Sequence, residues 1–255
     1  MKRRSLAFVR VEPLFGPFLF TLCAFTATAN DLGGFGTPDK QPLVVSFIGT
    51  GNNNALASVN TVTFTAQAIG AALADRYVAV AFHIRGNVDP VLSSATIGGV
   101  SATILQQFSQ SAQSAVGFII SSTPIPTGTT ANITLNFASA NALSAGIFIY
   151  TVNQLLRPSN IIGSGTLLAT ATNPAVIGSA NSEGGAVEFW IMRNSNGDGS
   201  GDVFTPVASG SITGSVCGTG GDCYSGFSIS TSPASAGVSD NRSAGSVGGS
   251  SITVR

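Results

Sequence analysis

Residues 75–85 read DRYVAVAFHIR, and after a short polar loop residues 94–105 read SATIGGVSATIL. In the first segment large apolar side chains alternate with mostly small ones, and this period of two residues predicts a β-strand. The large face carries Val78, Val80, Phe82 and Ile84, and the other carries Tyr77, Ala79, Ala81 and His83. We therefore expect this strand to face the main core on one side and a close neighbour on the other.

The second segment holds two short β-rich runs on either side of Gly98 and Gly99. A Gly-Gly pair readily adopts the positive φ angles of a tight two-residue turn, so the sequence predicts a hairpin here. A central strand, a loop and a hairpin are typical of a β-sandwich, and they carry no catalytic signature.

Further strand patterns recur along the chain, with turn residues between them. They lie at residues 43–48, 59–68, 115–121, 131–137 and 145–152. This regular spacing, without a helical pattern of useful length, predicts an all-β protein with an antiparallel β-sandwich or jelly-roll-like fold. We expect the sandwich to cover residues 41–255, after an N-terminal arm or signal-like segment plus linker at residues 1–40.

An internal echo suggests how the sandwich is organised. The run AVAFHI at residues 79–84 recurs as AVEFWI at residues 186–191, and an Ile-Gly pair precedes each run. The echo indicates pseudo-repeated halves at about residues 41–156 and 157–255; two tandem modules and chance similarity are the alternatives. One large sandwich is favoured, because the region after Arg193 is too rich in glycine and serine to close an independent core easily.

The composition is apolar and poorly charged. Hydrophobic residues make up 44% of the chain, charged residues 9%, and the formal net charge is zero. Basic residues form no run beyond the first ten, so nucleic acid is not expected as a partner. Lysine occurs only at Lys2 and Lys40. Because buried interfaces are depleted in lysine, this pattern favours a surface covered by identical neighbours, with a compositional habit of the source proteome as the alternative.

The first thirty residues have the layout of a secretory signal. Basic residues precede an apolar run, and Ala27-Thr28-Ala29 resembles a cleavage site. The run is interrupted by Pro17 and is too short to span a membrane, so no membrane partner is expected for the mature form. If the segment is retained, we expect its large apolar side chains to anchor the sandwich in a neighbouring subunit: Phe15, Phe18, Leu19, Phe20, Leu22 and Phe25.

Two local features suggest a disulfide and a metal site. Cys217 and Cys223 bracket a short flexible loop that would close as a disulfide in an oxidising compartment, with a reduced pair as the alternative. Asn194, Asn196, Asp198 and Asp202 hold oxygen-bearing side chains at spacings that echo a calcium loop. Thr205 stands where that loop needs a bidentate glutamate, so a plain turn between strands is the alternative, and no other cofactor is expected.

The sequence offers little footing for catalysis. His83 is the only histidine, and it lies in a strand without a local serine or cysteine partner. The chain contains no G-x-S-x-G elbow, no H-E-x-x-H pair and no phosphate-binding glycine loop. A structural histidine is therefore expected, and the protein is not expected to be an enzyme.

Three segments resemble a known group of proteins: ADRYVAV at residues 74–80, LSSATIGGVSAT at 92–103 and PTGTTANIT at 126–134. They resemble β-sandwich proteins encoded in the structural-gene regions of tailed bacteriophages and prophages, over about residues 43–155. The resemblance implies a virion structural protein, in capsid decoration or in a tail or fibre. It further implies copies of itself and other virion proteins as partners, with no cofactor and no catalytic residues.

Two other functions stay open at this point. A signal-like N-terminus would suit a secreted bacterial surface or adhesive protein. A carbohydrate-binding module would need an exposed aromatic platform, for which Trp190, Tyr77 and Tyr150 are the candidates. In that case the partner would be a glycan on a host surface.

Overall fold

A computed structural model describes most of residues 43–254, with gaps at 54–55, 112, 139–141, 156–160, 171–174, 183–185, 195–202, 207–209, 217–221, 230–233 and 242–246. Residues 41–255 form one compact unit. Within the described ranges every regular element is a β-strand, and the strand pairs are antiparallel, which confirms the expected all-β fold.

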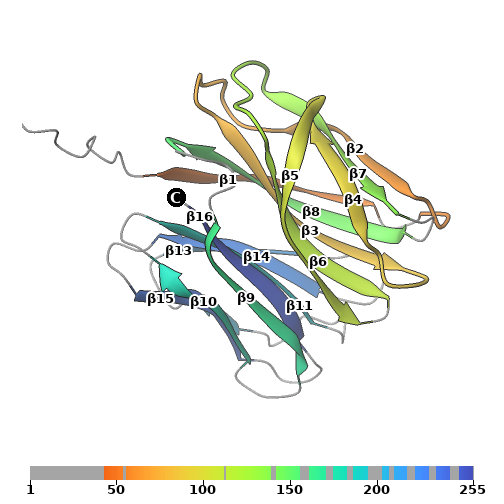
Figure 1. The fold of residues 1–255 in the computed structure, drawn as a ribbon, viewed down its shortest axis with the longest axis vertical. Coiled ribbons are helices and arrows are strands. Elements are labelled where there is room, and N and C mark those ends of the chain that lie inside the picture. The colour runs from red at the N-terminus through yellow and green to blue at the C-terminus, as the bar shows by residue number, and fades with distance from the viewer. Residues whose placement is uncertain are drawn as a thin grey trace, which may run out of the picture. The chain divides into compact units, whose positions relative to one another are not determined.

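The first eight strands form one sheet in the order β1-β8-β3-β6-β5-β4-β7-β2 (Figure 1). Each strand predicted in this half is present, with its ends shifted by a few residues. The strands are β1 (Val44–Asn53), β2 (Thr61–Ala68), β3 (Tyr77–Gly86), β4 (Leu92–Ile97), β5 (Val100–Ser111), β6 (Ser114–Ser121), β7 (Thr130–Phe137) and β8 (Ala142–Asn153).

The remaining strands form two smaller sheets. The five-stranded sheet has the order β13-β14-β11-β16-β9, and the three-stranded sheet has the order β10-β15-β12. Figure 1 shows the five-stranded sheet between the other two. The strands are β9 (Ile161–Thr170), β10 (Ala175–Ser182), β11 (Val187–Asn194), β12 (Val203–Pro206), β13 (Gly210–Val216), β14 (Asp222–Ile229), β15 (Ala234–Asn241) and β16 (Val247–Val254).

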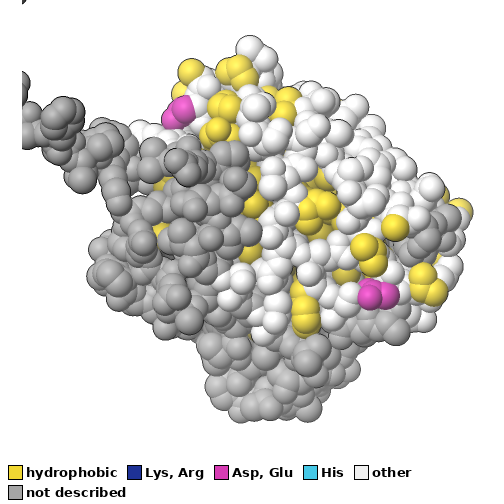
Figure 2. Space-filling view, viewed as in Figure 1, with side chains coloured by type: hydrophobic (Ala, Val, Ile, Leu, Met, Phe, Trp, Pro, Cys, Tyr) yellow, Lys and Arg dark blue, Asp and Glu magenta, His cyan; other side chains and the backbone are white. Residues whose placement is uncertain are grey.

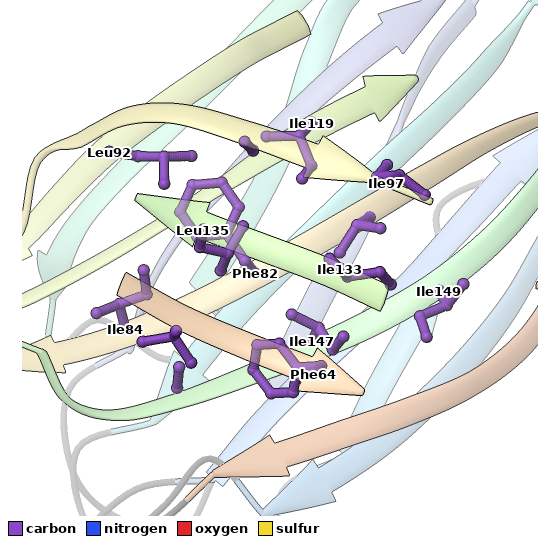
Figure 3. Close-up of a cluster of buried hydrophobic side chains, with 14 of the residues drawn as sticks. Phe64, Phe82, Ile84, Leu92, Ile97, Ile119, Ile133, Leu135, Ile147 and Ile149 are labelled. Atoms are coloured by element: carbon purple, nitrogen blue, oxygen red, sulfur yellow. The ribbon is translucent and has the colours of Figure 1, made fainter. Parts of the chain in front are cut away.

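The eight-stranded sheet curls around the first hydrophobic core and nearly closes on itself. Its two edge strands, β1 and β2, approach each other closely: a Cβ added to Gly51 of β1 would lie only 3.0 Å from the Phe64 ring of β2. Figure 3 shows Phe64 beside Ile147 of β8, although β2 and β8 stand far apart in the strand order. The curl thus gives one face of all these strands a common apolar interior.

A second core fills the space between β3, β6 and β8 and the five-stranded sheet. It is built around Tyr150, whose ring centroid lies 5.6 Å from that of Phe47, 5.3 Å from that of Phe189 and 6.0 Å from that of Phe227. The Tyr150 hydroxyl donates to Ser225 Oγ at 2.8 Å, and Ser225 Oγ donates to the Trp190 carbonyl at 2.8 Å. Aromatic packing and this hydrogen-bond chain join the two sheets.

Strand β3 confirms the expectation of two different buried faces. Its large residues, Val78, Val80, Phe82 and Ile84, lie in the first core. Its small residues Ala79 and Ala81 lie in the second core, where they let the five-stranded sheet approach closely. A strand buried on both faces needs an almost continuous apolar run, which this sequence supplies.

The predicted hairpin is present between β4 and β5. Ile97 pairs with Val100, and Gly98 and Gly99 adopt φ angles of 61° and 81°. Two successive positive φ angles define a type I′ turn, which glycine enters without strain.

The internal echo is less regular in space than in sequence. The runs at residues 79–84 and 186–191 fall in β3 and β11, both inside their sheets. Ile69 and Gly70 lie between β2 and β3, however, whereas Ile177 and Gly178 lie within β10. The pseudo-repeat of the two halves stays a prediction.

One buried cation was not foreseen. The Arg76 side chain is inaccessible to solvent, and its guanidinium donates to five backbone carbonyls. The acceptors are Ile125 at 3.0 Å, Gly70 and Ala71 at 2.7 Å, Thr127 at 2.9 Å and Gly128 at 3.0 Å. These bonds join the loop before β3 to the loop before β7, far apart in sequence, and they use every guanidinium donor.

We predict that the Gly98-Gly99 turn requires glycine because of its positive φ angles, and not because a side chain there would clash with neighbouring atoms. Nothing lies within 4 Å of a Cβ added to Gly99, so Gly99→Ala should cost about 1–2 kcal/mol of unfolding free energy through its positive φ alone. Gly49→Ala is the matched control, because its added Cβ also meets open space but its φ is not positive. Urea denaturation measures both, and equal effects would contradict the explanation.

We also predict a graded loss of stability at Arg76. Lysine has three donors, so Arg76→Lys should leave at least two carbonyls unsatisfied and lower the unfolding free energy by about 2–4 kcal/mol. Arg76→Met removes every donor and should cost more. Chemical denaturation of the three proteins tests this order, and two variants within about 1 kcal/mol of the parent would contradict it.

Candidate functional site

His83 lies at the polar end of the second core and is fully buried. Neither ring nitrogen has a hydrogen-bond partner among the described residues. Burial, and next the positive charges of Arg193 and Arg85, hold the pKa of His83 well below its usual value of 6.5. The imidazole is therefore neutral at pH 7 and out of reach of a substrate, which fits a structural histidine.

Two arginines and two serines surround this end of the core. Arg193 of β11 donates from Nη1 to Ser114 Oγ of β6 at 3.0 Å, which ties the five-stranded sheet to the eight-stranded sheet. Arg85 of β3 stands in register with Ser114 on one side and with Ser144 of β8 on the other. Burial, and to a smaller extent Arg85, lower the pKa of Arg193. The cluster joins the sheets and offers no accessible nucleophile with a base beside it.

The aromatic platform expected for a carbohydrate-binding module is not formed. Trp190 is fully buried in β11, and Tyr150 is fully buried at the centre of the second core. Tyr77 is half-buried and packs against the same core. These rings stabilise the sheets instead, because aromatic side chains bury more apolar area than other residues. Trp190 and Tyr150 therefore do not offer the exposed platform that the carbohydrate-binding alternative requires.

The metal, disulfide and anchor predictions fall mostly outside the described residues. Asn194 ends β11, while the other calcium candidates, Asn196, Asp198 and Asp202, lie outside the described ranges. The described residues contain no group of three His, Cys, Asp or Glu side chains that would hold a metal ion. Cys223 lies in β14, but Cys217 is not described. The same holds for the anchor residues Phe15, Phe18, Leu19, Phe20, Leu22 and Phe25. These predictions remain untested.

The surface feature that stands out is a neutral face on the eight-stranded sheet. Four neighbouring strands, β5, β4, β7 and β2, contain no Asp, Glu, Lys, Arg or His at all. Soluble domains carry about 25% charged residues, so four adjacent strands without one are unusual. In Figure 2 no lysine or arginine is visible among the described side chains on the side that it draws, and the charged side chains seen there are acidic (magenta).

Strand register arranges hydroxyl and amide side chains on this face in two rows. One row crosses all four strands through Thr63, Thr134, Thr96 and Ser101, and the other runs through Thr61, Asn136 and Ser94. Neighbouring strands lie about 4.8 Å apart, so the side chains of one row are within hydrogen-bonding reach. We call these seven residues the neutral face; each is exposed or half-buried.

The side chains of the neutral face hold one another in place. The hydroxyls of Thr63 and Thr134 lie 3.2 Å apart. Thr61 Oγ1 donates to Asn136 Oδ1 at 3.1 Å, and Asn136 Nδ2 donates to Ser94 Oγ at 3.1 Å. The alternation of threonines in β2 and the lack of charge were visible in the sequence. Their alignment across four strands depends on register, which the sequence does not reveal.

We predict that His83 makes the fold sensitive to mild acid. The unfolded chain gains a proton near pH 6.5, whereas the folded chain gains it only well below that pH. Stability is therefore complete above pH 6.5 and falls as the pH drops below it, at up to about 1.4 kcal/mol per pH unit. Urea denaturation between pH 7 and pH 5 measures the loss, and His83→Asn should lack this slope. Parallel pH profiles for the two proteins would contradict the prediction.

The described residues contain no helix long and apolar enough to cross a membrane. No protein-family model, no curated protein and no solved structure matches this chain.

Proposed function

We propose that this chain is a non-enzymatic structural protein of a bacteriophage virion, in capsid decoration or in a tail or fibre component. It acts by multivalent assembly, with copies of itself and other virion proteins as partners. The observation that carries the proposal is the neutral face, which presents hydroxyl and amide groups over four adjacent strands without a single charge.

Such a face is suited to being covered by protein. Burying a charged side chain costs several kcal/mol unless it is paired, whereas a hydroxyl or amide needs only a hydrogen-bond partner. Protein interfaces are depleted in Lys, Glu and Asp, although they are depleted in serine as well. The whole chain shares this trend, with only two lysines and 9% charged residues.

The buried polar groups support a structural role. The only histidine in the chain is enclosed between two sheets and neutral, and Arg76 spends all of its donors on backbone carbonyls. Both side chains therefore act in holding strands and loops together. Three sheets packed around two apolar cores form a domain that suits a protein present in many copies on a particle.

We predict that residues 1–40 anchor the chain in the particle. If they are retained, their large apolar side chains need a protein partner, because exposed apolar patches of this kind are costly in water. Deleting residues 1–40 should leave a folded domain, as judged by circular dichroism and urea denaturation, that is lost from particles purified from the source host.

Two results would contradict this proposal. Normal occupancy of the truncated chain in the particles would exclude the anchoring role. The second result is protein recovered from outside the cells, and not from particles, whose intact mass is that of a chain cleaved after Ala29. This result would favour a secreted surface protein instead.

A further inference from the structure

We infer that the neutral face binds the neutral face of a second copy of this chain, about a two-fold axis. This inference rests on the proposed function and assigns the contact between copies to β5, β4, β7 and β2. Four properties of the face support this contact: its hydrogen-bonding groups, its lack of charge, the hydrogen bonds that already fix its side chains, and the irregularity of its edge strand β2.

The hydrogen-bonding groups of the face are self-complementary. All but one of the seven side chains of the neutral face are threonine or serine, and each hydroxyl both donates and accepts. The seven are Thr61, Thr63, Thr134, Asn136, Thr96, Ser94 and Ser101. The amide of Asn136 also carries both functions. A two-fold contact brings the same surface of each copy together, so a surface must match itself, and this one does.

The lack of charge narrows the choice of partner. If the partner's surface carried Lys or Glu at its centre, binding would remove water from those charges. No opposite charge on β2, β4, β5 or β7 would replace it. That mismatch costs several kcal/mol per buried charge. The matching surface must be neutral and rich in hydroxyls, and the chain presents such a surface itself.

The face is also ordered before it binds. Hydrogen bonds within the rows already fix Thr61 to Asn136, Asn136 to Ser94, and Thr63 to Thr134. Immobilising a free side chain on binding costs about 0.5–1.5 kcal/mol, so side chains that are already fixed reduce this cost. Ser93 is fixed in the same way, because its hydroxyl donates to the Asn136 carbonyl at 3.0 Å.

The edge strand favours contact through the face rather than through added strand pairing. Strand β2 is irregular between Phe64 and Gln67, and Ala66 there has a positive φ of 51°. The Ala66 N–H is directed to Asn132 Oδ1 at 2.9 Å, within the same sheet. A bulge of this kind bends the edge away from a regular ladder and hinders continuation of the sheet into a second copy.

The test compares lysine substitutions in the full-length chain by sedimentation velocity over a range of concentrations. Thr63→Lys and Thr134→Lys place a charge in the central row and should weaken self-association at least about tenfold in Kd. Thr50→Lys is the matched control, because Thr50 is an exposed threonine of β1 outside the neutral face. Its Kd should equal that of the parent.

A charge-swap experiment separates loss of contact from loss of folding. A mixture of Thr134→Lys and Thr134→Glu should associate more tightly than either variant alone, which misfolded protein would not do. A monomeric parent, or equal weakening by Thr50→Lys, would overturn the inference. The inference would also be overturned if the parent chain does not self-associate but binds a glycan, and Thr63→Lys abolishes that binding.

These outcomes are distinct from those that test the proposed function. If the parent chain is monomeric in solution and Thr63→Lys still enters particles normally, the inference is overturned and the virion role remains. Self-association through the neutral face by a chain that is absent from particles would support the inference and overturn the virion role.

Discussion

The fold depends on three adjacent strands, β3, β6 and β8, that are buried on both faces. One face of these strands fills the curled eight-stranded sheet, and the other face supports the five-stranded sheet. On β3 large side chains such as Phe82 face the first core and small ones such as Ala81 face the second, whereas β8 places large side chains, such as Ile149 and Tyr150, on both faces. These three strands are therefore shared by both cores, and both cores pack against the same backbone.

Local features of the sequence predicted local structure well. The alternation at Val78, Val80, Phe82 and Ile84 and the Gly98-Gly99 pair act over a few residues, so their strand and turn could be read directly. Features that depend on distant pairing could not be predicted. The neutral face requires Thr63, Thr134 and Thr96 to align on three strands, and the Tyr150 bond to Ser225 links two sheets. The burial of Trp190 is another property that the local sequence does not reveal.

Buried polar groups are managed in two contrasting ways. Arg76 remains charged because five carbonyls replace its water, and two of these belong to Gly70 and Gly128, whose positive φ angles of 77° and 72° occur in the loops that surround it. His83 lacks such partners and loses its charge instead. The first solution strengthens the connection between loops at all pH values near neutrality, and the second leaves the seam between the sheets dependent on proton concentration.

The position of β16 bears on when the chain can reach its native state. This strand lies between β11 and β9, and it contributes Ile252 and Val254 to the second core. Residues 247–254 must therefore leave the ribosome before the five-stranded sheet can be completed, although β9 and β11 emerge much earlier. Non-local pairings of this type fold slowly, and the emerging chain exposes unpaired strands meanwhile. Synthesis thus sets the order of events: the curled sheet has all its strands first, and the second layer closes over it only once β16 has arrived.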